Sequence, residues 1–404
     1  MKKSISFIMI SVLIIALAII AVNTHNPSEP TPQNIAAKES KNSSTIDEEM
    51  PKKEMRGMWV SYISLDMSNT DRSESAFREK LSTIISTAKE NSCNAIFIHV
   101  RAFCDALYKS EVYPSSHILW GTQGAFENYD ALQIIIDECK NENIEVHAWI
   151  NPFRIKTSTS GFELSSKNPY YEMNKACVEY GDGIYLNPAS KDARNLILSG
   201  VKEIIENYSV DGIHFDDYFY PTSDESFDKE EYNRYLKSCK SQSDAMPLTK
   251  WRQHNVNLLI CDVYRLIKDY DNSIQFGISP QGNIQNDLDM GADVLSWTEC
   301  LGYVDYICPQ LYFSLKNPAL EFKAGLDKWL EMSFHKNLKF YVGLGVYKAG
   351  TDADSGTWLD ESDILKKELE IIRNQNLDGY ILYDYNAMIS ENAQTEMANF
   401  KDAL

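Results

Sequence analysis

Two carboxyl groups stand next to each other in the apolar run Gly212–Phe219, as Asp216 and Asp217. Carboxyl groups at the end of a strand can do acid–base chemistry, in which one donates a proton and the other acts as base or nucleophile. The alternation of a strand turns His214, Asp216 and Tyr218 to one face and Asp217 to the other, until the strand frays. Asp216 is therefore the better candidate for a carboxylate that faces a substrate, while Asp217 can follow it or bond loop amides.

Cleavage of a glycosidic bond usually needs two carboxyl groups, one that protonates the leaving oxygen and one that acts as nucleophile or base. Asp216 supplies one of them. For the second we order the candidates Asp217, Asp384 and Asp105, because the fifth apolar run ends without an acid. Asp211 comes before its strand and is expected to be a turn or capping residue.

Polar and aromatic residues gather where the apolar runs end. Aromatic rings with polar edges suit sugars, which present a C–H face and hydroxyl edges. A single residue of this kind is usually structural, but residues from many runs that end at one rim indicate a substrate site. The candidates for substrate contacts are Trp59, His99, Arg101, Asp105, Trp149, Asn151, Arg154, His214, Tyr218, Gln281, Gln310, Tyr312 and Tyr347.

Eight apolar or β-branched runs recur along the chain, and helical patterns follow most of them. The runs are Met58–Ser64, Ala95–Arg101, Glu145–Asn151, Gly212–Phe219, Gln275–Pro280, Tyr306–Phe313, Lys339–Val346 and Gly379–Tyr385. The helical patterns are Glu74–Asn91, Tyr129–Asn141, Asp192–Tyr208, a stretch up to Tyr270, Asp293–Leu301, Leu320–Met332, Glu361–Asn374 and Asn392–Ala403.

This strand–helix alternation implies parallel strands with right-handed crossovers, and eight units predict an α/β fold, a single-domain (β/α)8 TIM barrel. The alternative is an open doubly wound sheet, which would be expected to carry a glycine-rich phosphate loop after its first strand. Ser61–Asp66 stands there instead, so the barrel is preferred. In a barrel the carboxyl ends of all strands meet at one rim, which would bring the candidate residues together.

A metal site is the main chemical rival. His99, His147 and His214 end three consecutive runs, and Asp216 or Asp384 could join them as ligands. The chain has no H-x-H or H-x-x-x-H pair, however, and single histidines also bond sugar hydroxyls. We therefore expect no metal and no other cofactor. A nucleophilic serine is disfavoured too, because the G-x-S-x-G turn is absent.

The amino terminus has the pattern of an export segment. Lys2 and Lys3 precede the apolar run of residues 5–22, so residues 1–23 are predicted to be a signal peptide or a membrane anchor. Residues 24–53 are rich in proline and polar residues and lack aromatic ones, as a flexible tether would be. Residues 54–404 then form the barrel, on the outer side of the membrane, either secreted or tethered to it.

The composition limits the partners. The 404 residues carry a net charge of −19, whereas binding of nucleic acid needs clustered lysine and arginine. We expect a polysaccharide or other glycan as substrate, no nucleic acid, and a monomer. The eight cysteines contain no C-x-x-C pair and are expected to be small apolar residues of the core.

Several ordered motifs resemble those of the glycosyl-hydrolase-like family 10 domain, also described as a family 10 glycosylhydrolase. The resemblance covers about residues 54–386 and implies a TIM barrel in an exported bacterial protein. It also implies activity on cell-envelope glycan, such as peptidoglycan strands stripped of their peptides. Besides the Asp211–Tyr218 motif, it rests on Glu54–Val60, Arg101, Asp105–Tyr108, Pro114–His117, Gly121–Gly124, His147–Pro152, Tyr185–Pro188, Ser279–Pro280 and Pro309–Tyr312.

The motif Asp211–Tyr218 also faintly resembles the chitinase pattern D-G-x-D-x-D-x-E. It departs from that pattern at His214, where an acid would stand, and at Tyr218, which replaces the glutamate proton donor. These departures argue against a chitinase mechanism. Two alternatives to a carboxylate glycosidase stay open at this point: a glycan-binding protein without catalysis, and a metal-dependent carbohydrate hydrolase or deacetylase.

Overall fold

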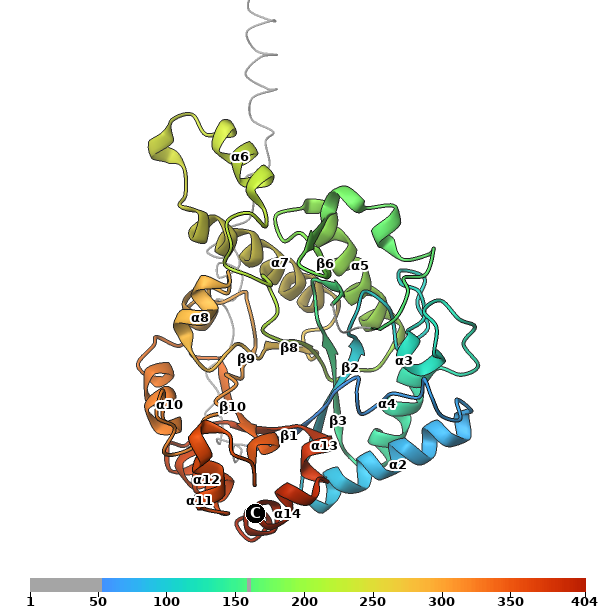
Figure 1. Ribbon diagram of the computed structural model, residues 1–404, viewed down its shortest axis with the longest axis vertical. Coiled ribbons are helices and arrows are strands. Elements are labelled where there is room, and N and C mark those ends of the chain that lie inside the picture. The colour runs from blue at the N-terminus through green and yellow to red at the C-terminus, as the bar shows by residue number, and fades with distance from the viewer. Residues whose placement is uncertain (1–52, 158–160) are drawn as a thin grey trace, which may run out of the picture. The chain divides into compact units, whose positions relative to one another are not determined.

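The computed structural model describes residues 53–157 and 161–404, and eight of its strands close into a parallel barrel (Figure 1). Around the barrel the strand order is β1-β11-β10-β9-β8-β7-β3-β2. This confirms the predicted (β/α)8 barrel. The strands are β1 (Met55–Val60), β2 (Ala95–Arg101), β3 (Glu145–Ile150), β7 (Gly212–Phe215), β8 (Gln275–Ile278), β9 (Tyr306–Ile307), β10 (Lys339–Gly345) and β11 (Gly379–Tyr383).

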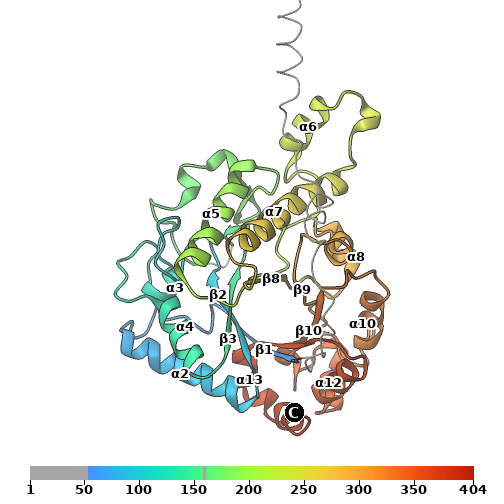
Figure 2. The ribbon, with the colours of Figure 1, turned by 180° about the vertical axis from the view of Figure 1, so that it is seen from behind.

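Helices surround the barrel on the outside, as the two opposite views show (Figures 1 and 2). The first, α2, begins where the Ser73 hydroxyl caps the Ala76 amide, and it buries an apolar stripe that includes Phe77 and Leu81. The predicted helical patterns all contain a helix. The longer helices are α2 (Glu74–Glu90), α4 (Ala131–Asn141), α5 (Lys191–Asn207), α6 (Lys229–Ser238), α7 (Leu248–Tyr270), α10 (Phe322–Leu330), α12 (Ile364–Asn374) and α14 (Gln394–Lys401).

Short helices lie in the connections between the strands, and one of them, α13, directly follows β11 at the rim. They are α3 (His117–Trp120), α8 (Ile284–Asp289), α9 (Val294–Glu299), α11 (Thr357–Asp360) and α13 (Tyr385–Met388).

Three strands, β1, β7 and β9, differ from their predicted bounds by more than two residues, and β7 ends at Phe215 instead of Phe219. Strand β1 begins and ends a few residues earlier than predicted, because Ser61 and Tyr62 accept turn hydrogen bonds from the Ser64 and Leu65 amides. Strand β9 is only two residues long, and Pro309, which has no N–H to donate to a ladder, follows soon after it.

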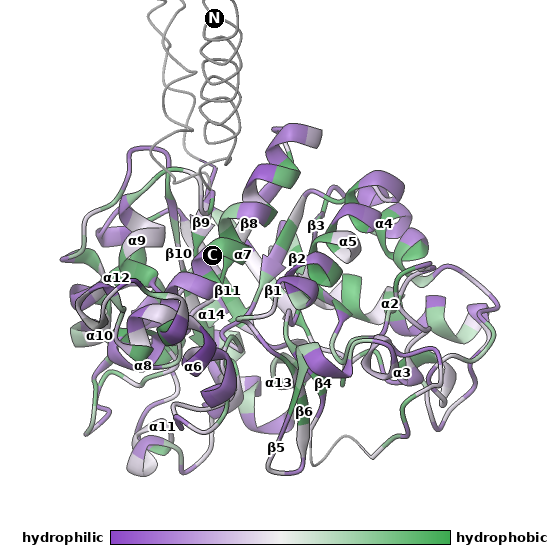
Figure 3. Ribbon diagram, turned by 90° about the horizontal axis from the view of Figure 1, so that it is seen from above, coloured by the Kyte–Doolittle hydropathy of each residue, from purple (hydrophilic) through white to green (hydrophobic). Residues whose placement is uncertain are grey.

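A small antiparallel sheet that the sequence analysis did not predict lies between β3 and α5. It has the order β4-β6-β5, from β4 (Arg154–Lys156), β5 (Cys177–Tyr180) and β6 (Gly183–Leu186). Figure 3 shows it at the same end of the barrel as α13, which follows β11. This sheet therefore belongs to the carboxyl-end side, where it positions Arg154.

The amino ends of the strands are joined by acidic side chains. The Asp211 carboxylate accepts a hydrogen bond from the Val146 amide at 2.7 Å, as expected for a structural residue. Asp305 accepts from the Phe276 amide at 2.7 Å, and Asp378 does the same for strand β10. Each of these residues precedes one strand and bonds the neighbouring strand that comes before it in the chain, which helps to fix the register between the two.

All eight cysteines lie in the described residues and none is in a disulfide; four are buried, three half-buried, and Cys300 is exposed. Among residues 53–157 and 161–404, no helix has the length and apolar character to cross a membrane. The predicted export segment, residues 1–23, and the tether except for its last residue lie outside the described part of the chain.

Candidate active site

Asp216 follows the last residue of β7 and is almost completely buried. Its carboxylate accepts hydrogen bonds from Trp149 Nε1 at 3.1 Å and from Asn151 Nδ2 at 3.2 Å, and the Tyr218 amide adds a longer one. Burial raises the pKa of Asp216, while the nearby Arg154 charge and these donors act in the opposite direction. Because every one of these contacts is made by an N–H donor, the site is built for the ionised carboxylate.

Asn151 is held so that it can only donate to Asp216. Its Oδ1 accepts the Arg154 amide at 3.0 Å, which turns Nδ2 toward the carboxylate. The residue follows directly after β3, and Trp149 is the penultimate residue of that strand. Two side chains from the end of β3 thus orient the carboxylate at the end of β7.

Asp217, the next residue, is half-buried and has a different environment. Its Oδ1 accepts a hydrogen bond from Gln310 Nε2 at 3.1 Å, and Gln310 is fixed in turn by the Ser279 carbonyl. Burial and then the neighbouring Asp216 charge raise the pKa of Asp217 to about 7. The group is therefore protonated below neutral pH, which is the state that a general acid requires.

Asp384, the third predicted catalytic residue, caps a short helix. Its Oδ1 accepts the Ala387 amide of α13 at 3.2 Å, and its Oδ2 accepts the Ser61 hydroxyl at 3.2 Å. The peptide bond before it, Tyr383–Asp384, is cis. Burial raises its pKa, but both oxygens already have structural partners, so its role as second carboxyl has less support than that of Asp217.

Four aromatic side chains lie together on the side of the rim formed by β1, β9, β10 and β11. Tyr312 and Tyr383 stack with ring centroids 5.4 Å apart, and Tyr347 meets both edge-on. Trp59 is buried beneath them, in edge contact with Tyr383. Tyr347 is 47% exposed, so it can offer a ring to a ligand, whereas Trp59, also a predicted substrate contact, is buried and cannot.

Arg154 is the cation beside the carboxyl pair. Its guanidinium lies 4.8 Å from the Phe103 ring, 5.3 Å from Tyr218 and 5.8 Å from Tyr62. Tyr218 is 53% exposed and covers the guanidinium from the solvent side. Arg154 and Tyr218, both predicted to contact substrate, thus form one unit next to Asp216.

The histidines of the predicted site point into the barrel. His214 Nε2 accepts from Trp59 Nε1 at 3.2 Å, so its proton is on Nδ1, where it can bond the Tyr306 hydroxyl at 3.0 Å. That hydroxyl also meets His147 Nδ1 at 3.2 Å. His214 is fully buried, and burial holds its pKa well below the usual range. This hydrogen-bonded chain leaves His214 as a neutral support for β7 beneath Asp216.

His99 stacks on Trp149 with 3.4 Å between ring centroids, and its Nδ1 accepts the Tyr62 amide. Burial lowers its pKa as well. In residues 53–157 and 161–404, no three His, Cys, Asp or Glu side chains come close enough to hold a metal ion. Of the three histidines that the metal hypothesis needs, His147 and His214 instead share the Tyr306 hydroxyl, and His99 stacks on Trp149.

Two predicted contacts lie behind the rim. Arg101 is buried against Tyr113, 4.8 Å from its ring, and donates to the Asn151 carbonyl. Asp105 is fully buried and accepts from His117 and Gln123, each at 3.1 Å. Both hold the connections after β2 and β3, so they are placed to support the site from behind.

Three residues near the site were not among the candidates. Tyr383 and Tyr62 stand at or just after strand ends, so the same strand-end signal could have included them. Asp287 is different, because it lies on α8, away from any strand end. It is buried, accepts the Gln281 amide at 2.9 Å, and burial keeps its pKa well above the usual range, with a further contribution from Asp217.

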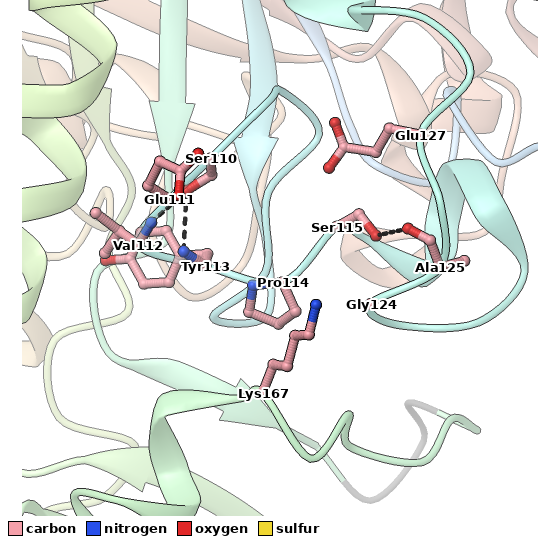
Figure 4. Close-up of a pocket in the computed structure, with 10 residues that line it drawn as sticks. All are labelled: Ser110, Glu111, Val112, Tyr113, Pro114, Ser115, Gly124, Ala125, Glu127 and Lys167. Carbon is pink, nitrogen blue, oxygen red and sulfur yellow. Dashed lines mark hydrogen bonds between the residues drawn. The ribbon is translucent and has the colours of Figure 1, made fainter.

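Two cavities lie in the connections around the rim. One, of about 370 Å³, is lined by Tyr62 and Phe103, the rings that also face Arg154. The other, of about 270 Å³, is shown in Figure 4. None of the predicted site residues lines it, and its Ser110 and Ser115 hydroxyls bond the surrounding backbone. The first cavity therefore adjoins the candidate site, and the second is separate from it.

Comparisons with known proteins place the chain among glycosyl hydrolases. The chain is 29% identical over 348 residues to glycosyl hydrolase YngK of Bacillus subtilis, an alignment that covers 80% of this chain and 67% of the relative. It is 27% identical over 355 residues to glycosyl hydrolase DigH of Escherichia coli K12, covering 78% of this chain and 79% of the relative.

Solved structures share the fold. The glycoside hydrolase domain of PgaB (BpsB) from Bordetella bronchiseptica superposes with a TM-score of 0.58 at 14% identity, over 87% of this chain and 98% of that one. A β-galactosidase from Rahnella sp. R3 gives a TM-score of 0.58 at 12% identity, over 88% and 56%. A family model described as Glycosyl hydrolase-like 10 matches residues 54–360. The chain therefore belongs to the glycosyl hydrolase-like 10 family.

Proposed function

We propose that this glycoside hydrolase cleaves a cell-envelope glycan, with peptide-free peptidoglycan strands as substrate, and that Asp216 and Asp217 are its two catalytic carboxyl groups. The observation that carries the proposal is the difference between these neighbours. Asp216 accepts hydrogen bonds from Trp149, Asn151 and the Tyr218 amide, whereas Asp217 accepts one from Gln310 and has a pKa of about 7. Two carboxyl groups that prefer opposite protonation states are what an acid–base pair needs.

Asp217 is the general acid in this proposal. Near neutral pH it carries a proton, and it is half-buried at the rim, so the leaving oxygen of a glycosidic bond can reach it. Gln310 holds its other side by donating to Oδ1, which fixes the direction of the group.

Asp216 is the ionised partner. It acts either on the anomeric carbon directly or on a water molecule that attacks this carbon. Trp149 and Asn151 orient it, and the Arg154 charge favours the ionised form. The two routes give opposite anomeric configurations in the first product, so the stereochemistry of the product distinguishes them.

Aromatic and amide groups around the pair supply sugar contacts. Tyr347 is the exposed ring on one side of the rim, and Tyr218 is the exposed ring on the other. Gln310 and Asn151 place amide groups beside the carboxyl pair. A sugar ring stacked on either tyrosine would meet hydrogen-bonding groups at its edge, as carbohydrate sites require.

The predicted export segment and tether place this activity outside the cytoplasm. In this proposal a single copy of the barrel works either as a secreted protein or on a tether of about 30 residues at the membrane surface. Release of the protein from washed membranes by high salt, or its presence in the growth medium, would distinguish the secreted form from the anchored one.

The test is hydrolysis of peptide-free peptidoglycan strands by the purified full-length protein, followed through newly formed reducing ends. Asp216→Asn should lose at least about 1,000-fold in kcat/KM. Asp137→Asn, which changes an exposed aspartate on α4, is the matched control and should behave as wild type.

Each alternative predicts a different result. Strands that bind without being cut would identify a glycan-binding protein, and activity that a chelator abolishes would identify a metal-dependent hydrolase. Full activity of Asp216→Asn would remove Asp216 from the mechanism.

A further inference from the structure

The cation at the carboxyl-end rim has no carboxylate of its own. Arg154 Nε donates to the Ala102 carbonyl at 2.9 Å, and three aromatic rings surround the guanidinium. Among the ion pairs of the described residues, none includes Arg154. Asp216 is near enough for the two charges to act on each other, but its hydrogen-bond donors are Trp149, Asn151 and the Tyr218 amide.

Two other cations near the rim, Lys348 and Arg101, are engaged elsewhere. Lys348 donates to Asp354 at 2.7 Å and to the Tyr312 carbonyl at 2.6 Å. Arg101 is buried behind the rim. Arg154 is half-buried, and the exposed Tyr218 lies over it, so its guanidinium is the cation that a ligand beside Asp216 would meet.

A guanidinium in this setting suits a planar anion. Its fork of N–H groups matches the two oxygens of a carboxylate, and the aromatic rings around it hold the fork in one orientation. Rings also exclude water, which strengthens a charge-assisted hydrogen bond relative to one at an open surface.

We infer that Arg154 recognises a free carboxylate on the sugar bound at the catalytic pair, and that this contact selects peptide-free strands. The inference rests on the proposed function. In peptidoglycan every second sugar bears a lactyl ether, whose carboxyl group is in an amide bond as long as the peptide is attached. Removal of the peptide leaves a carboxylate, so one guanidinium can tell the stripped strand from the intact one.

This contact is compatible with the acidic chain. A net charge of −19 opposes the binding of dense polyanions, but a stripped strand carries one carboxylate per disaccharide. Arg154, a single cation at the reacting sugar, can therefore select strands with free carboxylates even though the protein is acidic overall.

The test compares two substrates with the same backbone: stripped strands, and stripped strands whose lactyl carboxylates have been coupled to methylamine. The wild-type full-length protein should prefer the free carboxylate by about 10- to 100-fold in kcat/KM, the range of one charge-assisted hydrogen bond. In Arg154→Gln this ratio should fall to near 1, and in Arg154→Lys it should be intermediate. Arg265→Gln, an exposed arginine on α7, is the matched control and should keep the wild-type ratio.

The ratio separates recognition from support of Asp216. A general loss in Arg154→Gln affects both substrates equally and cancels in the ratio. A wild-type ratio near 1 would overturn the inference while the proposed function stands, as would an Arg154→Gln protein that keeps the wild-type ratio. No hydrolysis of either substrate by the wild type would overturn the proposed function and the inference together.

Discussion

The two ends of the barrel use the same side chain in opposite ways. At the amino ends, Asp211 and Asp305 each accept a backbone N–H of a neighbouring strand at 2.7 Å, which ties adjacent strands together. At the carboxyl ends, Asp216 is held by side-chain donors and Asp217 by one amide, and burial raises the pKa of both. The difference teaches that Asp211 and Asp305, bound to the backbone, serve the fold, while Asp216 and Asp217, held mainly by side-chain donors at the rim, are the proposed catalytic pair.

A perturbed pKa alone does not mark the site. Burial also raises the pKa of Glu396 on α14 and of Glu127 to about 7, and neither residue lies at a strand end. What distinguishes Asp217 is its position beside a second carboxyl group and an exposed tyrosine at the rim. Position on the barrel and protonation state together support the proposed pair.

The largest expected effect on activity comes from substituting one aspartate at each end of the barrel by asparagine and comparing the two variants. Asp216→Asn should reduce kcat/KM on peptide-free strands at least about 1,000-fold, because it removes the ionised group, yet the protein should still fold. Asp211→Asn should keep the wild-type kcat/KM per folded molecule. Reducing-end assays and circular dichroism on both variants check this. Equal losses of activity in the two variants would break the comparison.

Asp384 combines the properties of the two groups of aspartates. It lies at the carboxyl end of the barrel, like Asp216, but it accepts a backbone amide, that of Ala387, as Asp211 does at the amino end. We therefore expect Asp384→Asn to cost only about tenfold in activity, much less than Asp217→Asn, because Asp384 orients the rim and does not transfer the proton. Steady-state kinetics of the two variants at pH 6 give the comparison. A greater loss in Asp384→Asn would make Asp384 the second carboxyl.

At the amino end the expected effect is on stability. Asp211→Ala removes the acceptor of the Val146 amide and should lower the free energy of unfolding by about 1–2 kcal/mol. The kcat of the folded fraction should not change. Urea unfolding followed by fluorescence measures the first quantity. If Asp211→Ala kept its stability but had a reduced kcat, Asp211 would take part in catalysis and the structural role of the amino end would be wrong.

Glu396 tests the outer helices, where a buried carboxyl has no catalytic neighbours. Folding raises its pKa from 4.5 to about 7, so the folded state retains a proton that the unfolded state releases. The stability that the protonated Glu396 carboxyl contributes to the folded state is fully present below about pH 4.5 and is lost as the pH rises through 7. Glu396→Gln can still accept the Leu365 amide.

The variant should therefore be more stable than wild type at pH 8, by about 1 kcal/mol, and nearly equal to it at pH 5. Denaturant unfolding at the two pH values measures this difference. Stabilisation of the same size at both pH values would show that the carboxyl group does not titrate in this range.

The barrel could be predicted from the sequence because the same pattern recurs along the chain. Eight apolar runs, most followed by a helical pattern, each indicate one strand–helix unit of the fold. The β4-β6-β5 sheet was missed because its strands have three or four residues each, lie within one long connection and are mostly half-buried. Such strands carry little alternation of apolar and polar residues from which to predict them.

The site was predicted in outline but not in orientation. Period-two alternation placed His214 on the same face as Asp216, but β7 ends at Phe215, so the two side chains have different surroundings. His214 bonds Trp59 and Tyr306 inside the barrel, while Asp216 meets Trp149 and Asn151 at the rim. Contacts of this kind join strands far apart in the chain, and the order of residues does not reveal them.

The most direct test of the acid–base pair is the pH dependence of kcat/KM for wild type and Asp217→Asn on peptide-free strands. A general acid must be protonated, so wild-type activity should fall as the pH rises above about 7, approaching tenfold per pH unit. Asp217→Asn should be about 100-fold slower and should lack this alkaline decline. A decline that persists unchanged in Asp217→Asn would contradict the assignment of Asp217 as the acid.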